Sequence, residues 1–552
     1  MPATCACDGC PHRKCRIDAS RDQIAKDLLS VSEKDLNDDR HRFIPKGELC
    51  RILTHARVRK HLETISDDEK LLRKISKAVS PAESDFCHCN ESQCTGYRII
   101  FVALVQIAQE EVLFQVFESN DTKLCDRYWP RTLGGLSPKD SAIFAHAQLQ
   151  FRSPYITKLQ QHEVSFMDID QSVVLPWTEL EELQPELAHR SFVQKIKIHP
   201  DHYDFGNDGD EFALKVFEER PVAGLTGDDF LREIRCNQQT PIHGHIVPLL
   251  AAFRHRHRYY LVFPWARGGS LQTFFESRSP TEKTETGQIR WTMKWIMTQC
   301  LGLAQGLAAT HQGSNGIDDQ NSAQTKRQLH EDIKPENILC FETKQNGKSS
   351  MTLKLADFGL ARKLEADLTL AARKDAHTKT YRPPEHDTED RISPKFDVWC
   401  LGCLYLDFIT WKLGGWSKVI DFGKDRLQDD GRQVLEDTFF EKVTKRPFWF
   451  DLSKARLKID AVTKSKSKKE RVNWWSLWIG HCGTMVNSKV KQTVTSHIEY
   501  LMGHQECTDA IRAFLDFIRT RMLVVDPQER VDATVLRDFM HHVIEMMEEM
   551  EG

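Results

Sequence analysis

The stretch His330-Glu-Asp-Ile-Lys-Pro-Glu-Asn-Ile-Leu339 decides how this chain is interpreted. It places a carboxylate at Asp332, an ammonium group at Lys334 and a carboxamide at Asn337 within one short segment. A second stretch, Leu353-Lys-Leu-Ala-Asp-Phe-Gly359, has an apolar strand pattern that ends in an Asp-Phe-Gly triplet. Such a triplet alone occurs by chance in many sequences. Because it follows the first stretch at short range, with an apolar strand leading into it, the two together are a strong signal.

The first stretch resembles the catalytic loop H-R-D-x-x-x-x-N of eukaryotic protein kinases, and the second resembles their D-F-G triplet. In this family a carboxylate accepts the proton of the attacking hydroxyl and orients that hydroxyl toward the γ-phosphate of ATP. The resemblance therefore implies that Asp332 is catalytic, and that Lys334 neutralises charge on the γ-phosphate. It assigns Mg²⁺ to Asn337 and Asp357, because a hard cation takes oxygen ligands. Within the family, a lysine at this place is typical of Ser/Thr specificity.

Upstream stretches resemble the parts of a kinase that hold ATP. Glu211-Phe-Ala-Leu-Lys215 resembles the V-A-I-K strand, and Phe230-Leu-Arg-Glu233 resembles the helix whose Glu pairs with that Lys. Tyr259-Tyr-Leu-Val-Phe-Pro-Trp-Ala resembles the strand and hinge beside adenine, with a gatekeeper Phe, a Pro carbonyl and an Ala amide. The resemblance implies that ATP is bound by Val193, Ala213, Lys215, Glu233, Phe263, Pro264, Ala266 and Leu339.

Downstream, Thr378-Lys-Thr-Tyr-Arg-Pro-Pro-Glu385 resembles the end of the activation segment. Asp397 matches the residue that braces the backbone of the catalytic loop, and Arg530 is expected to form an ion pair with Glu385. The resemblance covers about residues 185–545. It implies an α+β, bilobal protein-kinase fold, with a small β-rich N-lobe and a large helical C-lobe, in a domain that we place at residues 186–545.

Two sites depart from the family pattern. If Val193 ends the Gly-rich loop, Glu186, Ala188 and Ser191 occupy the glycine positions, where glycine would let backbone N–H groups approach phosphate. Weak ATP binding, a differently shaped lid and a shifted alignment all stay open as explanations. In the catalytic loop, Glu331 replaces the Arg that docks a phosphorylated activation loop in many members. A Glu cannot dock a phosphate, so we expect activity that does not depend on activation-loop phosphorylation.

The chain outside the motifs has its own organisation. Residues 1–20 are Cys-rich and polar and are predicted to be a flexible tail. Residues 21–185 are predicted to form a helical leader domain and a linker. Within them, apolar spacing indicates one amphipathic helix over residues 44–58 and a buried helix over residues 99–108. A C-lobe insert of about residues 412–482 carries aromatic clusters, which indicate packed structure or a partner-binding surface.

Composition limits the other classes of function. The 16 Cys are spread over 552 residues, with neither a signal-peptide pattern nor an apolar run long enough to cross a bilayer. This predicts a reducing, cytoplasmic or nuclear setting with mostly free thiols. Cys7-Asp-Gly-Cys10 and Cys87-His-Cys89 invite a zinc hypothesis, but neither cluster completes a known ligand frame. The net charge of −4 gives no reason to expect binding to nucleic acid or membranes.

Three function classes fit the motifs. The first is a Mg²⁺–ATP-dependent Ser/Thr kinase that transfers the γ-phosphoryl group to protein hydroxyls. The second is a pseudokinase, a nucleotide-binding or scaffolding module, which the degenerate Gly-rich loop favours. The third is a small-molecule kinase, which Lys334 and the peptide-type segment 378–385 disfavour. We expect the first, with ATP and Mg²⁺ as cofactors and a protein substrate, and we leave open a protein partner for the leader domain or the insert.

Overall fold

The computed structural model forms two compact units. The first is bounded by residues 1–160, 165–227 and 249–265, and the second by residues 161–164, 228–248 and 266–552. The structure describes residues 13–36, 41–81, 96–118, 125–126, 129–159, 166–182, 191–206, 209–218, 227–312, 328–345, 348–359, 361–363, 370–371, 379–388, 391–428, 436–444 and 486–551.

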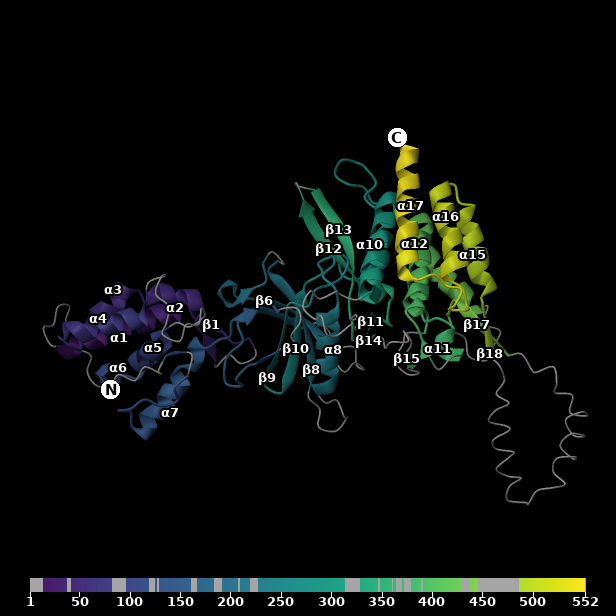
Figure 1. The fold of residues 1–552 in the computed structure, drawn as a ribbon. Coiled ribbons are helices and arrows are strands. Elements are labelled where there is room, and N and C mark those ends of the chain that lie inside the picture. The colour runs from purple at the N-terminus through teal and green to yellow at the C-terminus, as the bar shows by residue number, and fades with distance from the viewer. Residues whose placement is uncertain are drawn as a thin grey trace, which may run out of the picture. The chain divides into compact units, whose positions relative to one another are not determined.

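The N-terminal part of the first unit is a helical domain with its own core (Figure 1). Ile24, Phe101 and Phe144 are among its fully buried side chains. The helix α1 begins at Arg13, so residues 13–20 of the predicted flexible tail are helical. The elements are α1 (Arg13–Ser30), β1 (Glu33–Lys34), β2 (Arg42–Phe43), α2 (Lys46–Ile52), α3 (His55–Leu62), α4 (Glu69–Val79), α5 (Arg98–Gln106), α6 (Glu111–Glu118), α7 (Pro138–Ala147) and the 3-10 turn η2 (Leu149–Phe151).

The segment 44–58 forms parts of two helices, and the prediction of a single helix was wrong. Leu53 leaves the helical conformation at the end of α2, with φ −94° and ψ 60°. Thr54 then caps α3, because its side-chain oxygen accepts a hydrogen bond from the Arg57 N–H at 3.4 Å. The apolar spacing continues across this break, so periodicity alone could not reveal it. The predicted buried helix over 99–108 is confirmed by α5 up to Gln106, while Ala108 has a left-handed backbone with φ 58°.

A six-stranded sheet occupies the rest of the first unit, in the order β4-β9-β10-β8-β6-β5. On β8, Phe212, Leu214 and Val216 are buried in the core, while the residues between them are only partly buried. Because β4 and β5 belong to this sheet, it begins before residue 186, the predicted start of the kinase domain. The strands are β4 (Met167–Asp168), β5 (Trp177–Glu182), β6 (Ser191–Ile198), β8 (Glu211–Glu218), β9 (Ala251–His255) and β10 (Arg258–Pro264), besides the short parallel pair β3 (Ile156–Thr157) and β7 (Tyr203–Asp204).

The helical domain is joined to the sheet region within this unit. The 3-10 turn η3 (Pro200–His202) supplies two acceptors to the start of α2. His202 Nε2 accepts from the Lys46 N–H at 3.1 Å, and Asp201 Oδ2 accepts from the Gly47 N–H at 3.0 Å. The first N–H groups of a helix have no partner inside the helix. A turn of the sheet region therefore caps a helix of the leader domain.

The second unit is mainly helical, and α10 packs against α17 while α12 packs against α15 (Figure 1). Its large core includes the buried side chains of Trp399, Tyr405 and Trp411 on α12. The helices are α8 (Gly227–Gln239), α9 (Leu271–Ser277), α10 (Met293–Gln312), α11 (Glu385–Thr388), α12 (Lys395–Gln428), α15 (Gln492–Met502), α16 (Asp509–Phe517), the π-helical turn η5 (Ile518–Met522) and α17 (Ala533–Glu551).

Short antiparallel strand pairs position the loops of this unit. Three of the pairs bring together segments that flank the predicted site or the activation segment, and the fourth, β17 with β18, lies in and after the predicted insert. The pairs are β11 (Gln328–Leu329) with β14 (Arg362–Lys363), β12 (Ile338–Gln345) with β13 (Lys348–Leu355), β15 (Leu370–Ala371) with β16 (Arg391–Ile392), and β17 (Phe440–Thr444) with β18 (Val486–Val490).

The predicted insert is described in part. The element α12 continues through residue 412 but breaks at Gly415, which has a non-helical backbone with φ 74° and ψ −179°. A second helical segment then reaches Gln428, and the pair β17–β18 follows. We call residues 436–444 together with residues 486–491 the insert hairpin. The aromatic clusters at 446–450 and 473–478 lie outside the described residues, as do Cys7, Cys10 and the cluster 87–89.

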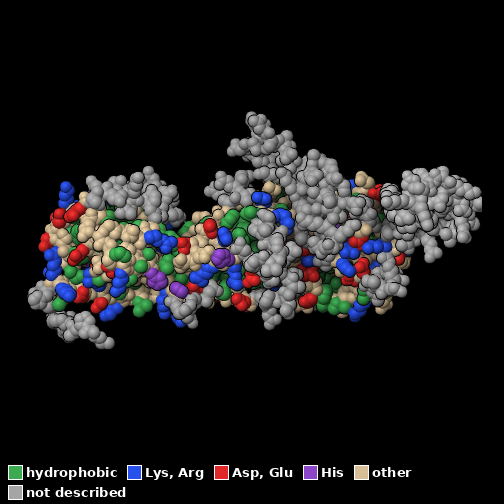
Figure 2. All heavy atoms as spheres, turned by 90° about the horizontal axis from the view of Figure 1, so that it is seen from below, with side chains coloured by type: hydrophobic (Ala, Val, Ile, Leu, Met, Phe, Trp, Pro, Cys, Tyr) green, Lys and Arg blue, Asp and Glu red, His purple; other side chains and the backbone are tan. Residues whose placement is uncertain are grey.

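Basic and acidic side chains are intermixed on the described face in Figure 2. Within the described part of the chain, no helix is long and apolar enough to cross a membrane. The same residues include no group of three or more His, Cys, Asp or Glu that could hold a metal ion.

Candidate active site

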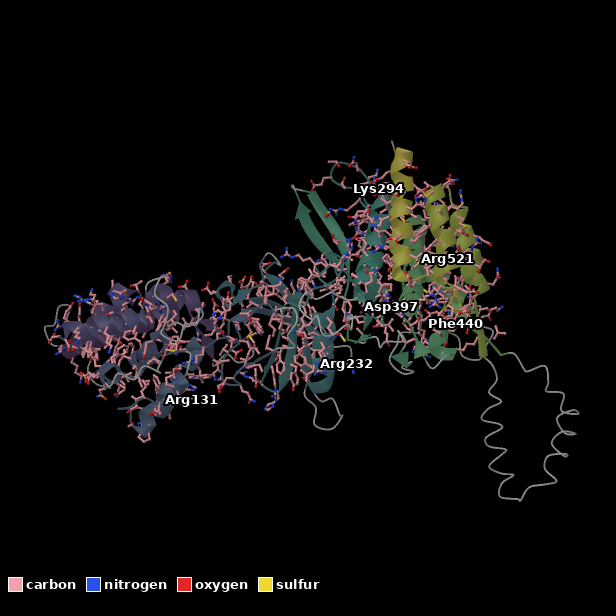
Figure 3. The ribbon with its side chains drawn as sticks, in the orientation of Figure 1. Arg131, Arg232, Lys294, Asp397, Phe440 and Arg521 are labelled. Atoms are coloured by element: carbon pink, nitrogen blue, oxygen red, sulfur yellow. The ribbon has the colours of Figure 1, made fainter. Side chains whose placement is uncertain are left out.

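The catalytic loop is held by Asp397, a buried carboxylate at the start of α12 (Figure 3). Its oxygens accept hydrogen bonds from the backbone N–H groups of His330 and Glu331, both at 2.9 Å. His311 Nε2, on α10, lies 2.8 Å from Asp397 Oδ2. Burial alone would raise the pKa of Asp397, but the hydrogen bonds and charges of His311 and His330 together lower it. The predicted brace is therefore present, and His311 supports it.

Two residues of the site have a left-handed backbone. Glu331 has φ 67° and Asp357 has φ 60°. This conformation costs free energy for residues other than Gly, and it persists where the surroundings fix it. At Glu331 the fixing contact is the hydrogen bond to Asp397, and the Glu331 side chain is buried. Backbone strain of this kind is common at functional sites, which agrees with the roles predicted for the segments that contain Glu331 and Asp357.

Side chains of the catalytic loop meet at Asp332. The 3-10 turn η4 (Pro335–Asn337) brings the side chain of Asn337 close to Asp332. Asn337 Nδ2 donates to the Asp332 backbone oxygen and to Asp332 Oδ2, both at 2.8 Å. Lys334 Nζ lies 3.0 Å from Asp332 Oδ2. Because the amide nitrogen of Asn337 bonds to Asp332, its amide oxygen is the atom suited to a hard cation.

Asp357 lies two residues after the end of β13, beside this cluster. The Ala356 N–H donates to the Asn337 backbone oxygen at 2.9 Å, which fixes the end of β13 against the catalytic loop. His330 Nε2 lies 3.1 Å from the Ala356 backbone oxygen, and the His330 and Phe358 rings have centroids 4.6 Å apart. The structure thus brings Asp357 next to Asn337. A carboxylate and an amide oxygen form a donor set that fits Mg²⁺.

Glu233, on α8, reaches the same region of the second unit. A Cβ atom added at Gly359 would lie 2.9 Å from Asp357 Oδ1 and 3.1 Å from Glu233 Oε2. Only glycine therefore fits between the two carboxylates without displacing one of them. Cys236 Sγ, one helical turn after Glu233, donates to the Ala361 backbone oxygen at 3.2 Å. This hydrogen bond holds α8 against the segment that follows the Asp-Phe-Gly triplet.

Four of the predicted ATP-binding residues of the first unit, Val193, Ala213, Lys215 and Phe263, share one face of the sheet. Val193 on β6 and Leu261 on β10 are the register partners of Lys215 on β8. Ala213, two residues before Lys215, is in register with Phe263. Successive side chains on a strand alternate between the faces, so these residues lie opposite the buried core face. Lys215 Nζ lies 5.5 Å from the centre of the Phe217 ring.

The hinge stretch is divided between the two units. In the first unit, Pro264 ends β10 opposite Phe212. In the second unit, Ala266 is buried and accepts the Gly269 N–H at 3.0 Å. The Ser270–Leu339 bridge then places the segment after Ala266 beside the predicted ATP-binding Leu339.

The predicted ion pair between Glu385 and Arg530 is confirmed. Arg530 Nη1 and Nη2 donate to the two Glu385 oxygens at 2.7 and 2.9 Å, and both side chains are almost completely buried. Arg530 also donates to the backbone oxygens of Val524 and Lys395. Paired guanidinium and carboxylate forks of this kind give strong, directional contacts. The end of the activation segment is therefore anchored in the second unit.

Comparison with known proteins agrees with this geometry. The family model described as protein kinase domain matches residues 205–543, more than half of the chain. The chain belongs to the protein kinase family. Its α+β, two-lobed fold and its helical N-terminal region are those predicted from the sequence.

The kinase also has curated relatives. It is 29% identical over 208 residues to the leaf rust 10 disease-resistance locus receptor-like protein kinase-like 2.4 of Arabidopsis thaliana, over 37% of this chain and 29% of that protein. It is 26% identical over 295 residues to a mitogen-activated protein kinase kinase kinase of Drosophila melanogaster, over 51% of this chain and 21% of that protein. The chain thus spans less than a third of the length of these relatives.

The motifs did not predict every residue that shapes the kinase site. His311 lies in a helix far from any catalytic motif, and nothing in its local sequence marks it. Asp437 belongs to the insert and contacts Thr380 of the activation segment, although no motif links the two. Gly359 was quoted only as part of the Asp-Phe-Gly triplet. The triplet itself could have indicated the role of Gly359, because the residue at its third position separates the Asp357 and Glu233 carboxylates.

Proposed function

We propose that this protein kinase is catalytically active and transfers the γ-phosphoryl group of ATP to Ser or Thr hydroxyls of proteins. The observation that carries the proposal is the cluster at Asp332, with Lys334 Nζ at 3.0 Å and Asn337 Nδ2 at 2.8 Å. The Asp397 brace fixes this cluster in place. Catalysis of phosphoryl transfer rests chiefly on such positioning and on charge stabilisation.

Each side chain has a separate task in this account. Asp332 Oδ accepts the proton of the substrate hydroxyl and orients that hydroxyl, which requires a fixed carboxylate. Lys334 places a positive charge where the transferred phosphoryl group gains negative charge. Asn337 and Asp357 would hold Mg²⁺, which when bound neutralises the phosphates of ATP. The resemblance to the family implies that Lys215 binds the phosphates of ATP and that Glu233 is the acidic member of the family's Lys–Glu pair.

The alternative is a pseudokinase that binds nucleotide or acts as a scaffold. The observation in its favour is the sequence at the glycine positions, Glu186, Ala188 and Ser191. Of these, Ser191 opens β6, and the other two lie outside the described residues. Against it stands the complete set of acidic, basic and amide groups at Asp332, Lys334, Asn337 and Asp357.

The test is transfer from γ-labelled ATP to peptide pools that contain only Ser, Thr or Tyr as acceptor, with Mg²⁺ or Mn²⁺. We expect label on Ser or Thr pools and little on Tyr. Nucleotide binding measured in the same samples without transfer to any pool would favour the scaffold. Label on a small molecule alone would favour a metabolite kinase. A cytoplasmic or nuclear location, proposed from the dispersed cysteines, is tested separately by imaging a tagged chain.

A further inference from the structure

The insert hairpin contacts the end of the activation segment through two acidic side chains. Thr380 Oγ1 donates to Asp437 Oδ1 at 2.8 Å and lies 3.0 Å from Asp437 Oδ2. Lys379 Nζ lies 3.1 Å from Glu436 Oε1, and Arg382 Nη2 lies 3.7 Å from Glu436 Oε2. Consecutive acidic residues of the insert therefore meet a hydroxyl and two cations of the segment.

Buried cations fix the backbone that carries these acidic side chains. Lys491 Nζ, which is fully buried, donates to the Glu436 backbone oxygen at 2.6 Å and to the Arg426 backbone oxygen at 2.7 Å. Arg426 Nε, also buried, donates to the Asp437 backbone oxygen at 3.0 Å. A charge withdrawn from water is costly unless it is well hydrogen-bonded. The two carboxylates are thus held in a fixed direction, unlike those of a mobile surface loop.

A second contact comes from β17, five residues after Asp437. Lys442 Nζ, on β17, lies 2.6 Å from Asp387 Oδ2, and Arg382 Nη2 lies 2.9 Å from the same oxygen. Burial alone would raise the pKa of Asp387, but the hydrogen bonds from His386 and Lys442 and the charge of Arg382 lower it. Through these two sets of contacts, the insert hairpin holds residues 379–388 in place.

The acidic residues of the insert hairpin bear on the replacement of the family's Arg by Glu331 in the catalytic loop. An Arg beside the catalytic Asp can dock a phosphorylated activation loop, but Glu331 occupies that place here. We propose that Glu436 and Asp437 are positioning residues that hold residues 379–382 in the conformation that receives the protein substrate. Negative charge then reaches the segment from the insert without a phosphate. This inference rests on the proposed kinase function.

The experiment compares Asp437→Ala with a control in the same hairpin, Glu441→Gln. Glu441 pairs with Lys489 at 2.8 Å within the hairpin, and both residues belong to the β17–β18 pair. We expect Asp437→Ala to raise KM for peptide about two- to thirtyfold, the range for coupling through packed contacts. KM for ATP should change little. Asp437→Glu should restore part of the loss, and Glu441→Gln should match the wild type.

A double-mutant cycle and hydrogen exchange make the test independent of overall stability. If Asp437 acts through Thr380, adding Thr380→Val to Asp437→Ala should cause no further rise in the peptide KM. Amides of residues 379–388 should exchange faster in Asp437→Ala, while the exchange of α16 and α17 stays unchanged. Equal peptide KM and equal exchange in Asp437→Ala and Glu441→Gln would overturn the inference.

Phosphatase treatment adds a third comparison, in which the wild type should keep its rate within a few-fold. A large loss would show that phosphate, and not the insert, holds the segment. Should the wild type transfer no phosphate at all, the proposed function fails. Hydrogen exchange then still decides whether Glu436 and Asp437 hold the segment.

Discussion

Arg530 shows how much depends on one side chain at the residue scale. Its guanidinium group and the Glu385 carboxylate are 0% and 1% exposed. Removing one partner of a buried pair leaves the other charged and unpaired, which is more costly than losing the attraction itself. The pair therefore anchors the activation segment only while both members are present.

We expect Arg530→Met to lower the free energy of unfolding by about 3–5 kcal/mol, because Glu385 would remain buried without its partner. The control is Arg512→Met, since Arg512 and Asp509 form a pair that is 50% and 80% exposed. Such an exposed pair contributes about 0–1 kcal/mol. Urea unfolding of the wild type and both variants measures the difference. Equal losses in the two variants would contradict the account.

The sequence predicted some residues of the site and missed others. Asp332, Asn337, Asp357, Asp397 and Arg530 lie in short motifs, where spacing along the chain reports the chemistry directly. The structure confirms the predicted contacts of Asp397 and Arg530. His311 and Asp437 were missed because they approach the site from distant elements, which only tertiary packing brings near. The individual ATP-binding assignments remain predictions.

At the scale of elements, capping explains where the sequence-based prediction was wrong. Apolar periodicity predicted helical structure over residues 44–58 and 99–108 but not the break at Thr54, because a cap changes the backbone conformation and leaves the apolar spacing intact. The cap of α2 could not be predicted either. It comes from η3, which lies far along the chain, in the sheet region of the same unit.

The η3 cap predicts a dependence of stability on pH. His202 Nε2 accepts the Lys46 N–H, while Nδ1 faces the Pro154 backbone oxygen at 3.0 Å, so the ring must be neutral to make both bonds. Burial lowers the pKa of His202 from 6.5 to about 4. The folded pKa lies below the unfolded one, so the stabilisation is complete above about pH 6.5 and is lost as pH falls toward 4.

We expect the wild type to lose free energy of unfolding more steeply than His202→Gln between about pH 6.5 and pH 4. Gln can donate and accept hydrogen bonds but takes up no proton. Other buried histidines, such as His255 and His497, are present in both proteins and cancel in the comparison. Urea titrations at several pH values provide the measurement. Parallel pH profiles would show that His202 does not cap α2 as a neutral ring.

At the scale of the whole molecule, two parts of the chain lie outside the kinase motifs. One is the leader domain, whose core runs from Ile24 to Phe151 and is separate from the core of the sheet region. The other is the insert hairpin, which contacts the activation segment. The sequence predicted the helical N-terminal region, whereas the insert of about residues 412–482 stays a prediction. It did not predict which residues either part contacts.

We expect residues 1–155 to fold alone, because this fragment contains the complete core of the leader domain. Its stability should be reduced, since the fragment lacks the η3 cap of α2. Circular dichroism of the fragment should show helix before and after a strong chelator. Loss of the helical signal on chelation would support the zinc hypothesis for the cysteine clusters. An unfolded fragment without chelator would show that the leader domain depends on the sheet region.

The central claim is that Asp332 performs catalysis in this chain. The most direct measurement is phosphate transfer and ATP affinity for the wild type and Asp332→Asn, side by side, with Mg²⁺ and with Mn²⁺. The account predicts that turnover falls about 10²–10⁴-fold in the variant, as expected for loss of a proton-accepting group. ATP affinity should be retained, because Asp332 does not hold the phosphates. Wild-type transfer no greater than that of Asp332→Asn with either metal, together with intact nucleotide binding, would contradict the claim and identify a pseudokinase.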